Sequence, residues 1–163
     1  MKYKSVNELN HFDLHDAVIE NIEWNGQTLT MKIDGINVSP ENSHNPTEKY
    51  MCTDKSVFIF EDCRIESIVY HGYNSHTHDG TVEVYDVKNV DENEFNDVFV
   101  ETVENQNYIQ VMKPFVDSSQ KVSFDICGNI GMGYRLIISY GKATTLWADY
   151  VHEAWFEDEK WKK

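Results

Sequence analysis

The sequence predicts one α+β domain over residues 1–163, mainly antiparallel β, with a β-meander and one or two short helices. Apolar residues recur mostly at every second position, which is the pattern of half-buried strands. Turn residues separate these runs, so sequential antiparallel neighbours are the expected topology. The chain has 163 residues, of which 40% are hydrophobic and 13% aromatic. That composition is sufficient for a core and argues against disorder, and no linker or repeat divides it.

The first elements expected are a short helix and a β-hairpin. The helix covers about Val6 to Asn10. The hairpin joins the alternating runs Val18–Trp24 and Leu29–Ile33 through Asn25-Gly26. Both turn residues tolerate the positive φ of a type I′ turn, which is the usual two-residue hairpin connection.

A long polar segment, Gly35–Lys55, separates this hairpin from the next strands. A loop of this length inside a compact domain is usually functional or ordered by its own packing. Two apolar strand segments follow, Val57–Phe60 and, after a bend, Ile65–Tyr70. We then expect a polar turn over Asn74–Gly80 and a strand over Val82–Tyr85.

Residues Asp91–Glu104 are the best helix candidate in the chain. Asp91 and Glu94 resemble a capping pair at its start. Its apolar positions follow at i, i+3, i+4 and i+7, namely Phe95, Val98, Phe99 and Thr102. The run is also rich in β-branched residues, so a strand of a hairpin is the alternative interpretation.

The last third of the chain predicts a four-strand β-meander. Its apolar runs are Tyr108–Met112, Val122–Ile126, Leu136–Tyr140 and Leu146–Tyr150. A glycine-rich turn at 128–131 separates the second run from the third. Gly141-Lys142 suits a type II′ turn between the third run and the fourth.

Charge is the clearest functional signal. The chain has 28 acidic residues against 14 Lys and Arg, a net charge of −14. Such a protein repels nucleic acid and anionic membranes, and it attracts cations and basic proteins. From residue 86 to 104 seven Asp and Glu stand against Lys88 alone, and a second acidic run near the end includes Trp155, Phe156 and Trp161.

These acidic runs serve either solubility or a basic partner. Interleaved aromatic residues favour a partner, because rings anchor an interface while charges raise the association rate. The expected contact residues lie in both runs: Asp91, Glu92, Glu94, Asp97, Glu101, Trp155 and Glu157.

A metal site is the second hypothesis. His71, His76, His78 and Asp79 lie close together in sequence, and histidine is the commonest transition-metal ligand. The alternative is a solvated turn closing at Asp79-Gly80. Structural zinc sites usually need four ligands at recognisable spacing, which favours the turn.

The segment Phe12–Asp16 contains a His-Asp pair that suits a metal dyad or a base with its orienting carboxylate. Adjacent residues on a strand face opposite sides, so the favoured interpretation is structural: Asp13 or Asp16 caps a turn, and His15 bonds to backbone.

No nucleophile motif and no cofactor fingerprint is present, so the sequence favours a non-enzymatic protein without cofactor. The three cysteines, Cys52, Cys63 and Cys127, are expected to be reduced thiols. We find no signal peptide and no spanning apolar stretch, which predicts a cytoplasmic protein.

The segment Phe12–Ala17, the strand Val18–Trp24 and the later strand Val57–Glu61 resemble the opening of many small bacterial proteins of unassigned function. Several such families resemble the immunity proteins of polymorphic toxin systems. The resemblance implies a cytoplasmic β-rich domain, with His15-Asp16 as its mark. It carries no catalytic residue across.

The function expected from the sequence is therefore a non-enzymatic acidic binding protein, for example an immunity protein that neutralises a basic toxin. One alternative is a metal-binding module or metal-dependent hydrolase that uses the His71, His76 and His78 cluster. Another is a homo-oligomeric structural domain whose meander edges pair with a second copy, although the like charge of each copy opposes it.

Overall fold

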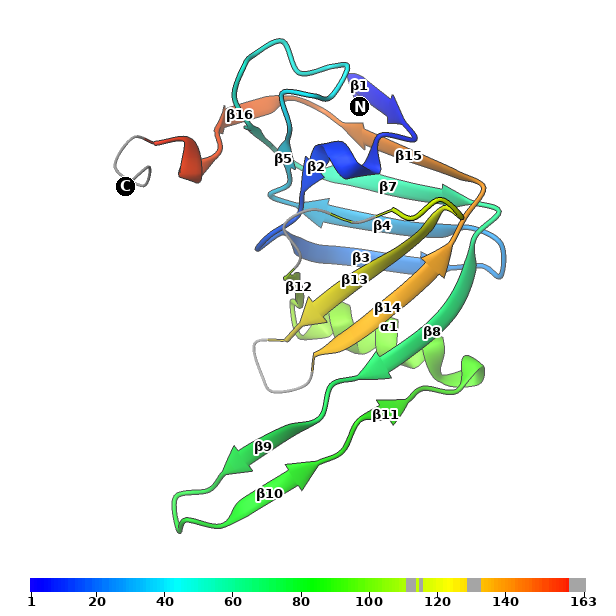
Figure 1. The fold of residues 1–163 in the computed structure, drawn as a ribbon, viewed down its shortest axis with the longest axis vertical. Coiled ribbons are helices and arrows are strands. Elements are labelled where there is room, and N and C mark those ends of the chain that lie inside the picture. Colours follow the sequence, from blue (N-terminus) through cyan, green and yellow to red (C-terminus); the bar gives the residue numbers. More distant parts are fainter. Residues whose placement is uncertain (111–113, 115, 129–132, 159–163) are drawn as a thin grey trace.

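The computed structural model describes residues 1–110, 114, 116–128 and 133–158 (Figure 1). It is mostly antiparallel β with one helical segment, as the sequence predicts. The main sheet contains β1 (Tyr3–Val6), β3 (Val18–Trp24), β4 (Leu29–Asp34), β7 (Ser56–Glu61), β8 (Arg64–Tyr70), β11 (Lys88–Asn89), β12 (Tyr108–Ile109), β13 (Lys121–Cys127), β14 (Tyr134–Ser139) and β15 (Lys142–Trp147).

The remaining elements are smaller. A four-stranded sheet contains β2 (Phe12–Asp13), β5 (Asn37–Val38), β6 (Met51–Thr53) and β16 (Tyr150–Glu153), and a separate hairpin contains β9 (Tyr73–His76) and β10 (Val82–Tyr85). The helices are α1 (Phe95–Glu104) and the 3₁₀ turns η1 (Leu9–His11), η2 (Glu92–Glu94) and η3 (Trp155–Glu157).

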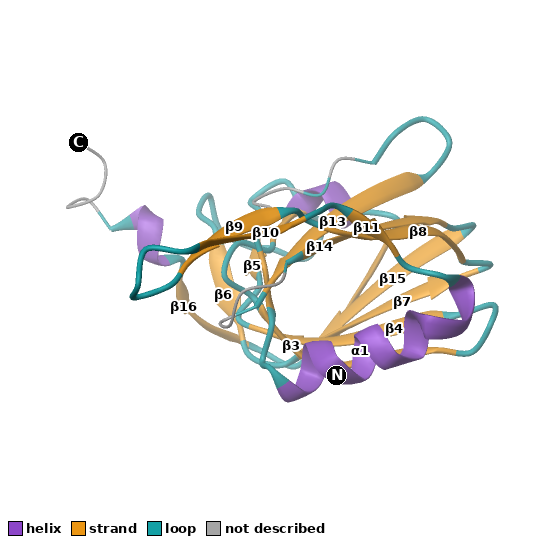
Figure 2. Ribbon diagram, turned by 90° about the horizontal axis from the view of Figure 1, so that it is seen from below, coloured by secondary structure: helices purple, strands orange, loops and turns teal. Residues whose placement is uncertain are grey.

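The main sheet curls into two layers around the core. Its strand order is β1-β15-β7-β4-β3-β12-β13-β14-β8-β11, and the first half lies across from the second (Figures 1 and 2). Phe60 of β7 and Phe124 of β13 meet between the layers with ring centroids 6.0 Å apart, and both are buried. The alternating apolar residues of the strands therefore face one shared interior.

Two connections carry the chain from one layer to the other, and they lie against each other. β7 runs into β8 through Asp62, which has a φ of 49°, and β14 runs into β15 through Gly141. The Gly141 N–H donates to the Glu61 carbonyl at 3.0 Å. A Cβ at Gly141 would lie 3.1 Å from the Asp62 side chain, so a larger residue there would have to displace Asp62 by a few tenths of an ångström.

The predicted four-strand meander is not confirmed. β12, β13 and β14 are neighbours in sequence order, but β15 pairs with β7 and β1 instead of β14. Gly141-Lys142 is therefore a corner and not a type II′ hairpin turn. Among the described residues the edges of the main sheet are β1 and β11, so no meander strand in that part of the chain lies at an edge of this sheet.

The first hairpin is confirmed, but its turn differs from the expected one. β3 pairs antiparallel with β4 from Trp24–Leu29 to Val18–Asp34. The loop spans Asn25 to Thr28, and only Gly26 has a positive φ, so the turn is not type I′. The Asn25 side chain accepts the N–H groups of Gln27 and Thr28, which builds an Asx turn in its place.

Other boundaries also move. The N-terminal helix is a single 3₁₀ turn at Leu9–His11, slightly later than expected. Residues 74–76 belong to β9, so the polar turn is shorter than Asn74–Gly80. Part of the predicted turn at 128–131, together with Met112 and Trp161, lies outside the described residues.

The predicted helix at Asp91–Glu104 is confirmed as η2 followed by α1. Asp91 and Glu94 form a reciprocal capping box. The buried residues of α1 are those of the predicted stripe: Phe95, Val98, Phe99 and Thr102. Burial of this stripe stabilises the helix despite its β-branched residues, because tertiary packing supplies most helical stability in proteins.

No helix in the described part of the chain is long and apolar enough to cross a membrane.

Candidate binding surface

Helix α1 presents the densest acidic surface that the sequence predicted. It runs along β3 with its apolar stripe against the sheet (Figure 2). Asp91, Glu92, Asp97 and Glu101 are exposed, and Glu94 is half-buried. The nearest cation along the chain is Lys88, whose Nζ lies 3.9 Å from Glu94 Oε2. The carboxylates therefore form a negative surface with little internal compensation.

Part of this acidic set gathers around a shallow hollow beside α1. Glu94, Asp97 and Glu101 line it together with Lys88, and its volume is about 130 Å³. The Tyr70 hydroxyl donates to Glu101 Oε2 at 3.2 Å from the neighbouring strand β8. The hollow is thus one place where several carboxylates face the same volume of solvent.

Helix stability explains the acids near the start of the helix but not those near its end. Carboxylates near a helix N-terminus interact favourably with the helix dipole, which accounts for Asp91, Glu92 and Asp97. Glu101 and Glu104 lie in the last turn, where no basic residue accompanies them. There the dipole is unfavourable for a carboxylate by about 0.3–1 kcal/mol. The hydrogen bond from Tyr70 offsets this cost for Glu101, so Glu104 is the acid that solubility or a partner must explain.

A larger groove runs along the other side of α1, between the helix and β3. Its volume is about 550 Å³. Apolar residues from both elements line it: Ile22, Trp24, Phe99, Val100 and Val103. Glu23 and Glu104 stand among the polar residues around it, and its lining contains no Lys or Arg.

Sequence reasoning missed this groove. Trp24 and Val100 are far apart in the chain, and only the fold places them on the same groove. One signal was available for Val100, which lies outside the buried stripe of its helix and is 57% exposed. An apolar residue out of register on an amphipathic helix marks a surface that the protein's own core does not cover.

The two remaining contact candidates are not on this surface. Trp155 and Glu157 belong to η3, which lies apart from α1 in both views (Figures 1 and 2). Glu157 accepts the backbone N–H of Tyr50 at 3.0 Å, so its carboxylate orders the chain end. Trp155 is 54% exposed and packs its ring edge against Phe156. The fold therefore places the predicted contact residues on two separate surfaces.

The histidine cluster does not form a metal centre. His76 is an exposed residue of β9, and His78 and Asp79 lie in the turn that follows. His71 lies at the base of the hairpin, with its Nε2 3.6 Å from Asp125. Among the described residues no group of three or more His, Cys, Asp or Glu side chains could hold a metal ion. Hydrogen bonds from Thr77 and Thr81 lower the pKa of Asp79 to about 2, as in a solvated turn.

The His15-Asp16 pair is closer than strand geometry would allow. Asp16 has a φ of 65°, and His15 Nδ1 lies 3.2 Å from Asp16 Oδ2. The expectation that the two side chains face opposite ways is wrong, because they lie in a turn and not on a strand. The expected turn cap is confirmed at Asp13, which accepts the His15 N–H at 2.9 Å.

The cysteines are poor nucleophiles. Burial raises the pKa of Cys63 to about 12. Burial also raises the pKa of Cys52 and of Cys127, with added repulsion from Asp34 and Asp125 respectively. The reactive species is the thiolate, so these environments disfavour cysteine catalysis.

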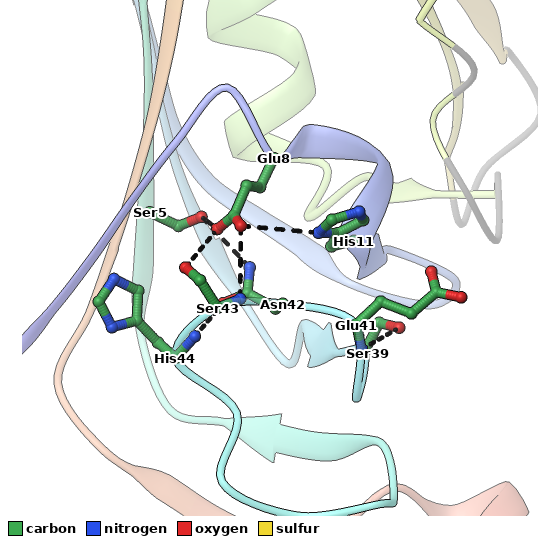
Figure 3. Close-up of polar contacts among 8 residues, drawn as sticks. All are labelled: Ser5, Glu8, His11, Ser39, Glu41, Asn42, Ser43 and His44. Carbon is green, nitrogen blue, oxygen red and sulfur yellow. Dashed lines mark hydrogen bonds and ion pairs between the residues drawn. The ribbon is translucent and has the colours of Figure 1, made fainter.

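A polar network near the N-terminus contains serine, glutamate and histidine, but its order is not that of a hydrolase. The Glu8 carboxylate accepts hydrogen bonds from the hydroxyls of Ser5 and Ser43, the latter at 2.9 Å (Figure 3). His11 Nδ1 lies 3.8 Å from Glu8. In a catalytic triad the histidine contacts the serine, whereas here Glu8 does.

This network instead orders the long segment 35–55. Asn42 donates to Ser5 at 3.2 Å, and Asn45 donates to the carbonyls of Val38 and Lys49 at 3.0 and 2.8 Å. The segment is therefore ordered by hydrogen bonds within itself and by hydrogen bonds to Ser5 and Glu8.

No family model, no curated protein and no solved structure matches the chain.

Proposed function

We propose that this protein is a non-enzymatic acidic binding protein that docks a basic protein partner on helix α1. The observation that carries the proposal is the exposed set Asp91, Glu92, Asp97 and Glu101 on the consecutive elements η2 and α1, with Lys88 as the only cation between residues 86 and 104. Carboxylates in this arrangement attract a basic surface from a distance and select against acidic partners.

Two further observations support a binding role. The last-turn acid Glu104 is unfavourable for the helix itself. The groove beside α1 adds apolar surface to the acidic surface, and specific interfaces combine apolar anchors with a charged rim. The N-terminal resemblance to immunity proteins makes a basic toxin the partner class to test first.

The experiment compares three forms of the protein as bait. The first is wild type. The second neutralises exposed residues of the α1 surface and keeps the capping box (Glu92→Gln, Asp97→Asn, Glu101→Gln). The third makes the same change of charge outside α1 (Glu41→Gln, Glu48→Gln, Asp62→Asn). All six positions are exposed, so each variant should fold.

A basic protein captured from the source organism's lysate should be retained by wild type and by the third form at low salt. It should be lost from the second form, and from every form at high salt, because salt screens exposed charges. Capture that the two variants reduce equally, or that salt leaves unchanged, would refute docking on α1.

A further inference from the structure

We infer that the groove between α1 and β3 receives a large apolar side chain from a cationic segment of the protein partner. The inference rests on the proposed function and adds to it the chemistry of the segment that docks. It identifies Trp24 and Val100 as the residues that contact the apolar side chain of the partner.

The groove exposes apolar side chains to solvent. Val100 is 57% exposed and Trp24 is only partly buried, although both line a groove whose floor includes the buried residues Ile22 and Phe99. The groove, at about 550 Å³, is large enough for an apolar side chain and its neighbours. Covering Trp24 and Val100 would remove apolar surface from water, which favours an apolar occupant.

The charged residues along the groove are mostly carboxylates. Glu23 and Glu104 border its main part. A second hollow shares Val103 with it and continues it past Glu20 and Asp34. Two cations lie near this continuation: Lys55, whose Nζ lies 2.9 Å from Glu20, and Lys32, which is on the same face of β4 as Thr30 and Asp34 and pairs with Asn21 of the groove. The four carboxylates outnumber these two ammonium groups, which favours an occupant that carries positive charge.

This charge also decides between occupants. A second copy of the chain would bring another net charge of −14 to the groove, and phosphate groups of nucleic acid or lipid would be repelled. A segment with Lys or Arg beside a large apolar residue complements both the apolar lining and the carboxylates of the groove. Interfaces commonly concentrate their binding energy in such an anchor.

The test uses two synthetic peptides of equal charge and length, one of lysine and leucine and one of lysine and serine. Trp24 reports binding through its fluorescence in a protein that also carries Trp155→Phe and Trp161→Phe, since the remaining Trp147 is fully buried. The lysine–leucine peptide should change Trp24 emission and bind at least about tenfold more tightly than the lysine–serine peptide at low salt.

Three variants separate the groove from charge alone. Val100→Asp adds a negative charge inside the groove, and Val84→Asp adds the same charge on β10, where Val84 is 67% exposed. Val100→Ser removes the apolar contact without any charge. Both Val100 variants should weaken the lysine–leucine peptide about tenfold, whereas Val84→Asp should not weaken it. If electrostatic attraction alone determined binding, Val100→Asp would bind the lysine–leucine peptide at least as well as wild type does.

The outcomes distinguish this inference from the proposed function. If both peptides bind equally, are unaffected by Val100→Ser and are lost when Glu92, Asp97 and Glu101 are neutralised, the groove inference is wrong and acidic docking stands. If neither peptide binds at low salt, the inference is wrong. If the Val100 variants lose binding of the lysine–leucine peptide and the variant neutralised at Glu92, Asp97 and Glu101 keeps it, the groove inference is supported. In that case the α1 carboxylates are not the docking surface.

Discussion

The Thr102 hydroxyl of α1 and the Tyr134 hydroxyl of β14 lie 2.7 Å apart in the interior of the protein. Thr102 also donates to the Val98 carbonyl at 2.7 Å. A hydroxyl has one proton to donate, so Tyr134 must be the donor to Thr102. Burial raises the pKa of Tyr134, which keeps that proton in place. This bond fixes α1 on the sheet and thereby sets the direction in which its carboxylates point.

Removing the two hydroxyls should have unequal effects. Tyr134→Phe leaves Thr102 bonded to Val98, and should lower the free energy of unfolding by about 1 kcal/mol. Thr102→Val leaves the buried Tyr134 hydroxyl without its partner, and should cost about 1–3 kcal/mol. Urea denaturation of both variants and of the double variant measures the difference. A Tyr134→Phe cost larger than that of Thr102→Val would contradict this account.

The Glu8 network predicts an acid-dependent loss of stability. Partial burial raises the pKa of Glu8, but hydrogen bonds from Ser5 and Ser43 outweigh burial and lower it below the ordinary value of 4.5. A carboxyl whose pKa is lowered by folding contributes stability above its unfolded pKa and loses it as pH falls through its folded pKa.

Comparison with Glu8→Gln isolates this contribution. Wild type should be more stable than the variant near neutral pH, and the difference should shrink as pH falls below 4.5. Thermal unfolding of both proteins across this range provides the measurement. A difference that is constant with pH would show that the charge of Glu8 contributes nothing.

Cys63 should resist thiol reagents in the folded protein. Its pKa of about 12 leaves almost no thiolate near neutral pH, and the residue is 5% exposed. In a protein carrying Cys52→Ser and Cys127→Ser, a disulfide exchange reagent should react only after unfolding. Rapid stoichiometric reaction with the native protein would refute the burial that the structure assigns to this thiol.

Gly72 should be required where the β9–β10 hairpin leaves the body of the protein (Figure 1). A Cβ there would lie 2.9 Å from the Tyr85 carbonyl oxygen and 3.1 Å from the Val87 nitrogen. Gly72→Ala should therefore displace the strands and disturb the stacked rings of Tyr73 and Tyr85, which lie 4.5 Å apart.

Because β10 is exposed throughout, the core should be unaffected by Gly72→Ala. Amide hydrogen exchange should accelerate in residues 73–85 and stay unchanged in β13 and β14. Unchanged protection in the hairpin would contradict the close approach.

The elements predicted best from the sequence are those whose period matches one buried face. The stripe Phe95, Val98, Phe99 and Thr102 predicted α1, and the alternation on both sides of Asn25-Gly26 predicted the first hairpin. The type of turn was wrong because the Asn25 side chain supplies bonds that the backbone would make in a type I′ turn.

The errors arise where the tertiary structure overrides a local pattern. Gly141-Lys142 has hairpin chemistry, but closure of the two layers sends β15 to β7. Sequence distance also does not show that the two acidic runs lie apart, at α1 and at η3. The groove depends on Trp24 and Val100 sharing one surface, which no local pattern encodes.

The most direct test of the account is the affinity for the basic protein captured in the experiment proposed above, measured by titration over a range of salt concentrations. Wild type and the variant neutralised at Glu41, Glu48 and Asp62 should bind alike and should weaken steeply as salt rises. The variant neutralised at Glu92, Asp97 and Glu101 should bind at least about tenfold more weakly at low salt and respond less to salt. Equal affinity and equal salt dependence in all three proteins would contradict docking on α1.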